Sequence, residues 1–213
     1  MNVIFARMQI AFSEKELFIF KKIAKAAEKL QLPCYLIGGF VRDKILNRPT
    51  KDADIMCVGD GIELAHNVAE LFNPKPPVAY FKNFGTAQIK LPDLELEFVG
   101  ARKESYEHDS RKPAVEPGTL EDDLLRRDFT INTLAVELNK KNFGNIIDRF
   151  EGIKQLREKI IKTPSEPAKT FSDDPLRMLR AVRFATQLGF IIEAETFNAI
   201  SLNAERIKII SQE

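Results

Sequence analysis

Two short stretches decide the interpretation of this chain: LIGGFVRD at residues 36–43 and KDAD at residues 51–54. An apolar run before the paired glycines predicts a strand, and the spacing after them predicts the start of a helix. Gly38 and Gly39 let backbone N–H groups approach a phosphate closely at that helix start, where Arg42 is placed to grip it. A plain strand-to-helix turn carrying a surface arginine is the alternative.

The second stretch places two carboxylates on one side of a predicted strand. Asp52 and Asp54 are two residues apart, so both side chains face the same way. Adjacent carboxylates repel each other, and their hard oxygen atoms suit Mg²⁺. An isolated pair of this kind is commonly a solvated strand end. Its position on the strand after Gly39 favours a metal site.

A predicted hairpin supplies further carboxylates. Residues 85–91 and 94–99 form two strand-like runs joined at Pro92-Asp93. Glu95 and Glu97 alternate on the second run, and two-metal phosphoryl chemistry commonly uses a third carboxylate. The alternative is the solvated face of an antiparallel sheet, which we favour for Glu95.

Two basic segments follow in the second half of the chain. Arg126, Arg127 and Asp128 stand at a predicted helix start, which suits a polyanion or a ribose, or else a surface salt bridge around a cap. Asp174 and Arg177 are three residues apart on a predicted helix. A carboxylate accepting from an amino group beside a guanidinium donating to a ring acceptor would prefer cytosine and adenine. A solvated helix with salt bridges is the alternative.

Composition narrows the possible classes of protein. The 213 residues include 32 Lys and Arg against 31 Asp and Glu, so wholesale basicity is excluded as a route to nucleic acid. Cys34 and Cys57 lie in apolar runs and predict reduced, buried thiols in the cytoplasm. No apolar stretch is long enough to span a membrane. Residues 100–118 are polar, with two prolines, and predict a mobile loop.

Taken together, four motifs resemble the class II tRNA nucleotidyltransferase and bacterial poly(A) polymerase family. The resemblance covers nearly all of residues 34–190. Its motifs are LIGGFVRD with KDAD, EDDLLRRDFTINTLA at 121–135, IIDRFEGIKQL at 146–156 and FSDDPLRMLRAVRFATQLGF at 171–190. The resemblance implies an α+β fold: a polymerase-β-like palm, with a mixed sheet and helices, followed by a helical neck. The expected domains are the nucleotidyltransferase head over 1–150 and the start of the neck over 151–213, without the body and tail.

Family roles carry over by matching positions. Asp52 and Asp54 match the metal-binding catalytic pair, and Glu97 is assigned as the third catalytic carboxylate. Asp174 and Arg177 match the residues that act as an amino-acid template for the incoming base. The nucleotide-binding residues implied by the resemblance are Gly38, Gly39, Arg42, Arg126, Arg127, Asp128, Asp174, Arg177, Arg180 and Arg183.

The implied activity is template-independent addition of CCA to tRNA 3′ ends from CTP and ATP, by two-metal nucleotidyl transfer with release of pyrophosphate. The implied cofactor is Mg²⁺, and the implied partners are a tRNA 3′ end or another RNA primer, ATP and CTP, with no membrane. A poly(A) polymerase, or an enzyme adding only CC or only A, shares these motifs. A non-catalytic RNA-binding module that retains the palm is a more distant alternative.

Overall fold

The computed structural model describes residues 10–106 and 113–210. The chain divides into two compact units, and each is described here by itself. The first unit contains the chain up to Ala101 together with Leu134–Ile147, and the second contains Arg102–Thr133 and the chain from Asp148 onward. The head over 1–150 and neck over 151–213 remain predictions. By compactness, residues 102–133 group with the C-terminal segment.

A seven-stranded sheet forms the centre of the first unit. Its order is β3-β4-β5-β2-β1-β8-β9. β2 and β5 are parallel, whereas the other neighbouring strands are antiparallel, so the sheet is mixed as predicted. The strands are β1 (Cys34–Ile37), β2 (Asp52–Cys57), β3 (Val78–Phe81), β4 (Thr86–Lys90), β5 (Glu95–Gly100), β8 (Ala135–Glu137) and β9 (Ile146–Ile147).

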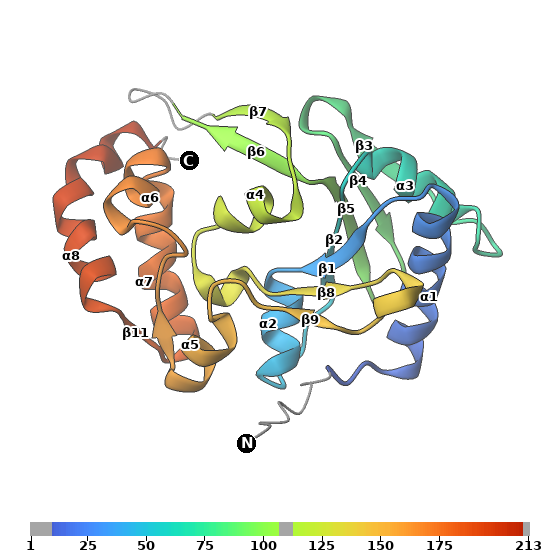
Figure 1. The fold of residues 1–213 in the computed structure, drawn as a ribbon, viewed down its shortest axis with the longest axis horizontal. Coiled ribbons are helices and arrows are strands. Elements are labelled where there is room, and N and C mark those ends of the chain that lie inside the picture. Colours follow the sequence, from blue (N-terminus) through green and yellow to red (C-terminus); the bar gives the residue numbers. More distant parts are fainter. Residues whose placement is uncertain (1–9, 107–112, 211–213) are drawn as a thin grey trace, which may run out of the picture. The chain divides into compact units, whose positions relative to one another are not determined.

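Helices cover the apolar face of this sheet. Figure 1 shows α1 (Glu14–Lys29) and α3 (Gly61–Ala69) on the same side of it. A capping box of Ser13 and Glu16 begins α1. The helix α2 (Gly39–Ile45) packs through Phe40 edge-to-face against Phe20 of α1, with ring centroids 5.8 Å apart. The fully buried strand residues on this face include Leu36, Ile55, Phe98 and Ile89.

The second unit is mainly helical. It contains β6 (Arg102–Ser105), β7 (Ala114–Pro117), α4 (Leu120–Leu125), α5 (Gly152–Glu158), β10 (Ile160–Ile161), α6 (Pro167–Asp173), α7 (Leu176–Leu188), β11 (Ile191–Ile192) and α8 (Ala194–Asn203). Thr119 and Asp122 form a capping box at the start of α4. Pro175 precedes α7 directly, and Gly189, in the left-handed conformation, ends it.

The prediction of a mobile loop over 100–118 is wrong for its described residues. β6 and β7 pair antiparallel, with Arg102 opposite Pro117 and Ser105 opposite Ala114. Residues 107–112 lie outside the described residues. The hairpin was missed because neither strand alternates apolar and polar residues: β6 reads Arg-Lys-Glu-Ser and β7 reads Ala-Val-Glu-Pro.

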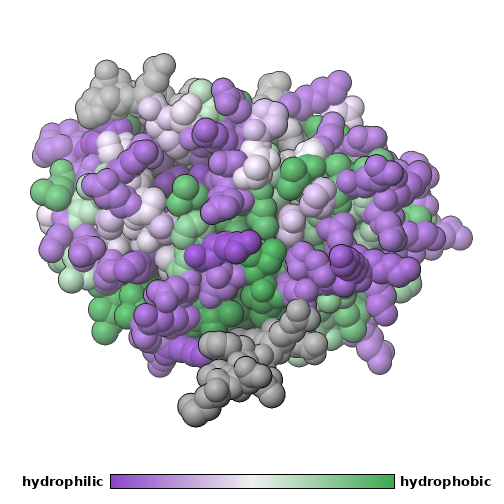
Figure 2. All heavy atoms as spheres, viewed as in Figure 1, coloured by the Kyte–Doolittle hydropathy of each residue, from purple (hydrophilic) through white to green (hydrophobic). Residues whose placement is uncertain are grey.

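The surface is largely hydrophilic, as expected for a chain in which 30% of the residues are charged. Most of the face visible in Figure 2 is hydrophilic. Among residues 10–106 and 113–210, no helix combines the length and the apolar character needed to cross a membrane.

Candidate active site

The predicted carboxylates lie on the polar face of the sheet in the first unit. Asp54 on β2 is directly opposite Glu97 on β5, and Glu97 is directly opposite Gln88 on β4. Residues that face each other across neighbouring strands point to the same side of a sheet. Asp54 and Glu97 are half-buried. Two like charges in this arrangement are unfavourable unless a cation relieves them.

A second row of carboxylates lies two residues earlier on the same strands. Asp52 is exposed and directly opposite Glu95. Glu95 forms an ion pair with Lys90 at 3.2 Å, and Lys90 is its direct neighbour on β4. Because a lysine already balances Glu95, its interpretation as a solvated sheet residue agrees with the structure. Glu97 faces Gln88 and has no such neighbour in register.

The donor set on this face fits Mg²⁺. In the described part of the chain, no group of three or more His, Cys, Asp or Glu side chains is arranged to hold a metal ion. Mg²⁺, however, commonly binds through one or two carboxylates, completing its shell with water and substrate phosphate oxygens. Asp52 and Asp54 share one face and supply hard oxygen atoms. The residues present therefore suit an ion that arrives with a nucleotide.

The glycine turn joins this face to α2. Gly38 has φ 71° and ψ −133°, a conformation that favours glycine. Its N–H donates to the carbonyl oxygen of Leu134 at 3.0 Å, which ties the turn to β8 and commits that donor to the fold. Gly39 then begins the helix, and a side chain there would come within 3.7 Å of an Arg42 guanidinium nitrogen.

Arg42 is buried within the first unit. Its guanidinium makes a two-pronged contact with Asp43, with both N–O distances 2.9 Å. It is 7% exposed, so a phosphate at this turn would meet a guanidinium that is already held in place. The predicted phosphate contact of Arg42 stays a prediction.

In the second unit, a buried aspartate organises the predicted nucleotide-binding arginines. Asp123 of α4 accepts hydrogen bonds from Arg126 at 2.6 and 3.0 Å and from Arg127 at 3.0 and 3.2 Å. Burial acts to raise the pKa of the Asp123 carboxyl, but the guanidinium groups of Arg127 and Arg126 outweigh it, so the pKa lies below its usual value. Asp123 was not predicted as a site residue, although its spacing to both arginines is a signal for helical ion pairs.

Asp128 also acts within the unit. It accepts hydrogen bonds from the Phe129 N–H and the Asn132 amide, both at 2.9 Å, and so stabilises the turn after α4. Its other oxygen pairs with Arg180 of α7 at 2.7 Å. The predicted helix start at these residues is wrong: Arg126 is the C-cap of α4, and the short 3-10 turn Thr130–Asn132 begins after Phe129 without a side-chain cap. The ion pair nevertheless brings together Asp128 and Arg180, two residues of the predicted nucleotide-binding set.

The predicted base-reading pair lies at the junction of α6 and α7; the prediction that both residues are helical is wrong for Asp174, which is the C-cap of α6, whereas Arg177 is in α7. Asp174 is extended, as residues before a proline commonly are, and its side chain accepts from the Leu176 N–H at 3.1 Å. Arg177 is 9% exposed and donates to the backbone oxygen of Arg126 at 2.6 Å. Arg183, in contrast, is exposed on the same helix.

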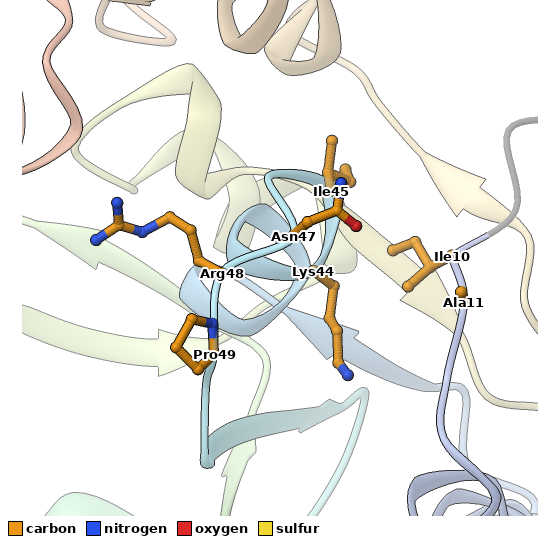
Figure 3. A pocket seen from close by; sticks show the side chains of 7 residues that line it. All are labelled: Ile10, Ala11, Lys44, Ile45, Asn47, Arg48 and Pro49. Atoms are coloured by element: carbon orange, nitrogen blue, oxygen red, sulfur yellow. The ribbon is translucent and has the colours of Figure 1, made fainter.

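Two pockets in the first unit involve other residues. One, of about 510 Å³, is lined by Ile10, Ala11, Lys44, Ile45, Asn47, Arg48 and Pro49, at the C-terminal end of α2. Figure 3 shows Arg48 extending away from Ile10 and Ala11. The other, of about 680 Å³, lies beside Phe18 and the proline-rich segment 73–77. None of the predicted site residues lines either pocket.

Comparison with known proteins gives one consistent result. The poly(A) polymerase head domain matches residues 34–162. An A-adding tRNA nucleotidyltransferase of Aquifex aeolicus is 42% identical over 165 residues, which cover 78% of this chain and 20% of that protein. A tRNA nucleotidyltransferase solved with a primer tRNA and an incoming ATP analog is 35% identical, with a TM-score of 0.74, over 86% of this chain and 50% of that one. A CCA-adding enzyme solved with CTP is 33% identical, with a TM-score of 0.79, over 92% of this chain and 43% of that one.

These matches establish the family but not the extent of the whole protein. The chain spans 20% to 44% of the length of the first curated relatives it matches. The predicted α+β class with a mixed sheet and helices is confirmed. The family match over 34–162 includes the glycine turn (Gly38 and Gly39), the carboxylate face (Asp52, Asp54 and Glu97) and the arginine cluster (Arg126 and Arg127 around Asp123). The chain belongs to the poly(A) polymerase head-domain family of nucleotidyltransferases.

Proposed function

We propose that this chain carries the catalytic residues of a template-independent RNA nucleotidyltransferase that adds CCA to tRNA 3′ ends. The observation that carries the proposal is the placement of Asp52, Asp54 and Glu97 on one polar face of a mixed sheet. In the reaction, the RNA 3′-hydroxyl attacks the α-phosphate of a nucleoside triphosphate, and pyrophosphate leaves.

In this proposal, Asp52 and Asp54 hold Mg²⁺, and Glu97 completes the negative face. When bound, Mg²⁺ lowers the pKa of the attacking hydroxyl and balances the charge of the triphosphate. The side chains need do no covalent chemistry, because phosphoryl transfer depends mainly on positioning and charge. Gly39 and Arg42 are assigned to the phosphates.

The second unit is assigned to the sugar and the base. Arg127, held by Asp123, contacts the ribose, and its neighbours Arg126 and Asp128 complete that motif. Asp174 and Arg177 select cytosine or adenine, and Arg180 and Arg183 make neighbouring nucleotide contacts. Relatives solved with tRNA, CTP or an ATP analog support these ligand classes. We assign the protein to the cytoplasm, where the free thiols Cys34 and Cys57 would stay reduced.

Addition of A alone is the second candidate. The Aquifex aeolicus relative is an A-adding enzyme, and it shares 42% identity with this chain. The carboxylate face, the arginine cluster and the base-reading pair serve both activities equally. The two candidates therefore differ in whether CTP binds.

The test is calorimetric binding of each of the four ribonucleoside triphosphates to this chain, with Mg²⁺. Asp52→Ala and Asp54→Ala should abolish Mg²⁺-dependent binding and leave the unfolding midpoint unchanged. Asp93→Asn, an exposed acid in the β4–β5 turn, is the control and should bind as the unaltered chain does. Comparable ATP and CTP affinities support CCA addition, ATP alone supports A addition, and binding of neither contradicts the proposed function.

A further inference from the structure

Glu104 of β6 is the centre of a buried polar cluster in the second unit. Its side chain is 3% exposed. One oxygen accepts from Arg102 at 2.8 Å and from Arg126 at 3.0 Å, and the other accepts the Tyr106 hydroxyl at 2.6 Å. A carboxylate this deeply buried needs such partners, and its two arginines supply the opposite charge.

Tyr106 links this carboxylate to the base-reading arginine. Because its hydroxyl donates to Glu104, the oxygen lone pairs remain to accept, and a guanidinium nitrogen of Arg177 lies 3.4 Å away. The Arg177 guanidinium carbon also lies 5.9 Å from the centre of the Tyr106 ring, within the range of a cation–π contact. Burial first, and the hydrogen bond to Glu104 second, raise the pKa of the Tyr106 hydroxyl, which therefore stays protonated as a donor at neutral pH.

Three contacts thus fix one guanidinium. One guanidinium nitrogen of Arg177 donates to the Arg126 backbone oxygen at 2.6 Å and to the Tyr106 hydroxyl at 3.4 Å, and the Tyr106 ring lies within cation–π range of the same guanidinium. Arg126 is in turn held by Glu104 and Asp123. The direction of the remaining Arg177 donors is therefore set by residues outside α7.

Fixed direction matters because arginine has only donors. Cytosine and adenine present an amino group beside a ring acceptor, whereas uracil and guanine present an oxygen beside a ring N–H. A guanidinium free to swing would donate to the oxygen of a wrong base as readily as to the ring nitrogen of a correct one. Selectivity therefore requires that the guanidinium be held opposite the ring position.

We propose that Glu104 and Tyr106 are positioning residues for base selection: they hold the Arg177 guanidinium in the one orientation that distinguishes cytosine and adenine from uracil and guanine. The inference rests on the proposed function, because it takes Arg177 as the base-reading residue. It adds a specificity role for two residues of a hairpin that carries none of the residues predicted from the sequence.

The experiment measures the dissociation constants of ATP, CTP, GTP and UTP for this chain with Mg²⁺, and the readout is the ratio of wrong-base to right-base constants. Arg177→Ala should reduce that ratio about tenfold. Tyr106→Leu should reduce it about fivefold, and Tyr106→Phe, which keeps the ring, about threefold. Glu104→Gln should reduce the ratio by about as much as Tyr106→Leu does, because Glu104 holds the Tyr106 hydroxyl.

Two matched controls accompany these variants. Tyr80→Leu removes a half-exposed tyrosine of β3, and Glu116→Gln neutralises an exposed glutamate of β7, on the same hairpin as Glu104. Both should leave the ratio unchanged. Tyr106→Phe also guards against failure of Glu104→Gln to fold, because it retains the packed ring.

The outcomes separate the two levels of inference. If Arg177→Ala leaves the ratio unchanged, the result contradicts the base-reading role of Arg177, and with it the positioning role of Glu104 and Tyr106. If Arg177→Ala collapses the ratio but the Tyr106 variants do not, only the positioning role is overturned. If Tyr106→Leu weakens the binding of all four nucleotides equally, the ratio stays unchanged. That result also overturns the positioning role, because it indicates a structural loss without an effect on base selection.

Discussion

Replacing Asp123 by Asn removes one buried charge from between two arginines. The carboxylate is fully buried and accepts four hydrogen bonds, two from Arg126 and two from Arg127, at 2.6 to 3.2 Å. The Asn side chain keeps the volume but presents an amide N–H₂ to guanidinium donors. One set of contacts is then lost, Arg127 loses the Asp123 charge, and Arg126 keeps only its ion pair with Glu104.

The expected loss of stability follows from this geometry. Removing one partner of a buried ion pair costs about 3–5 kcal/mol. The Arg126 and Arg127 side chains are 18% and 16% exposed, so water partly solvates the charges left behind. We therefore expect a loss of about 3 kcal/mol, at the lower end of that range. For a chain of this length, that loss lowers the unfolding midpoint by about 6–12 °C.

The pH dependence provides an independent check of the same reasoning. The folded pKa of Asp123 lies below the unfolded value of about 3.9. The carboxylate thus contributes its full stabilisation above that value and loses it as the pH falls through the depressed folded pKa. The difference between the unaltered chain and Asp123→Asn should be complete at neutral pH and should shrink below about pH 4.

Urea denaturation followed by circular dichroism measures the free energy of unfolding, and repeating it at several pH values measures how the difference between the two chains depends on pH. Asp93→Asn is the matched control: it makes the same change at an exposed carboxylate with one ion pair, to Lys15, and should leave the midpoint unchanged. A loss below about 1 kcal/mol, the range of a surface pair, would refute the buried-hub interpretation. A difference that stays constant down to pH 3 would refute the charge argument.

Three further predictions concern the carboxylate face, the glycine turn and the core. Glu97→Gln should weaken Mg²⁺-dependent nucleotide binding about tenfold in calorimetry, whereas Glu95→Gln, which only releases Lys90, should not; equal effects would contradict the assignment. Gly38→Ala should cost about 1–3 kcal/mol in urea denaturation because of its positive φ, whereas Gly39→Ala, with its nearest neighbour at 3.7 Å, should not destabilise. Phe129→Ala, which removes a fully buried ring packed 5.9 Å from Phe184, should cost about 3–5 kcal/mol, and the exposed Phe84→Ala almost nothing, by the same measurement.

The sequence predicted the elements around the glycine turn because their signals are local. An apolar run, two glycines and an alternating acidic strand are each contained within a few residues, and β1, α2 and β2 lie where they were expected. The β4–β5 hairpin was predicted for the same reason. The parallel pairing of β2 with β5, which sets Asp54 opposite Glu97, joins residues more than forty positions apart and has no local signal.

The arginine cluster shows the same division. Asp123 lies three and four residues before its two arginines, so its role could have been predicted from helical spacing. Glu104 reaches Arg126 across 22 residues, and Tyr106 reaches Arg177 across 71. Such contacts depend on how the β6–β7 hairpin folds back on α4 and α7, and a hairpin whose strands lack an alternating apolar pattern resembles a loop in its sequence.

The arginines assigned to the nucleotide share one physical feature: most of them are already held by a carboxylate. Arg42 pairs with Asp43, Arg126 and Arg127 with Asp123, and Arg180 with Asp128. A long side chain that is ordered before binding loses less rotamer freedom when the nucleotide arrives. The same pairing reduces the net positive charge offered to the phosphates, so the arginines serve geometry more than attraction. Strong attraction for a triphosphate would then have to come from a cation on the carboxylate face, which is why the Asp52 and Asp54 variants should lose binding even though neither residue is assigned to the base.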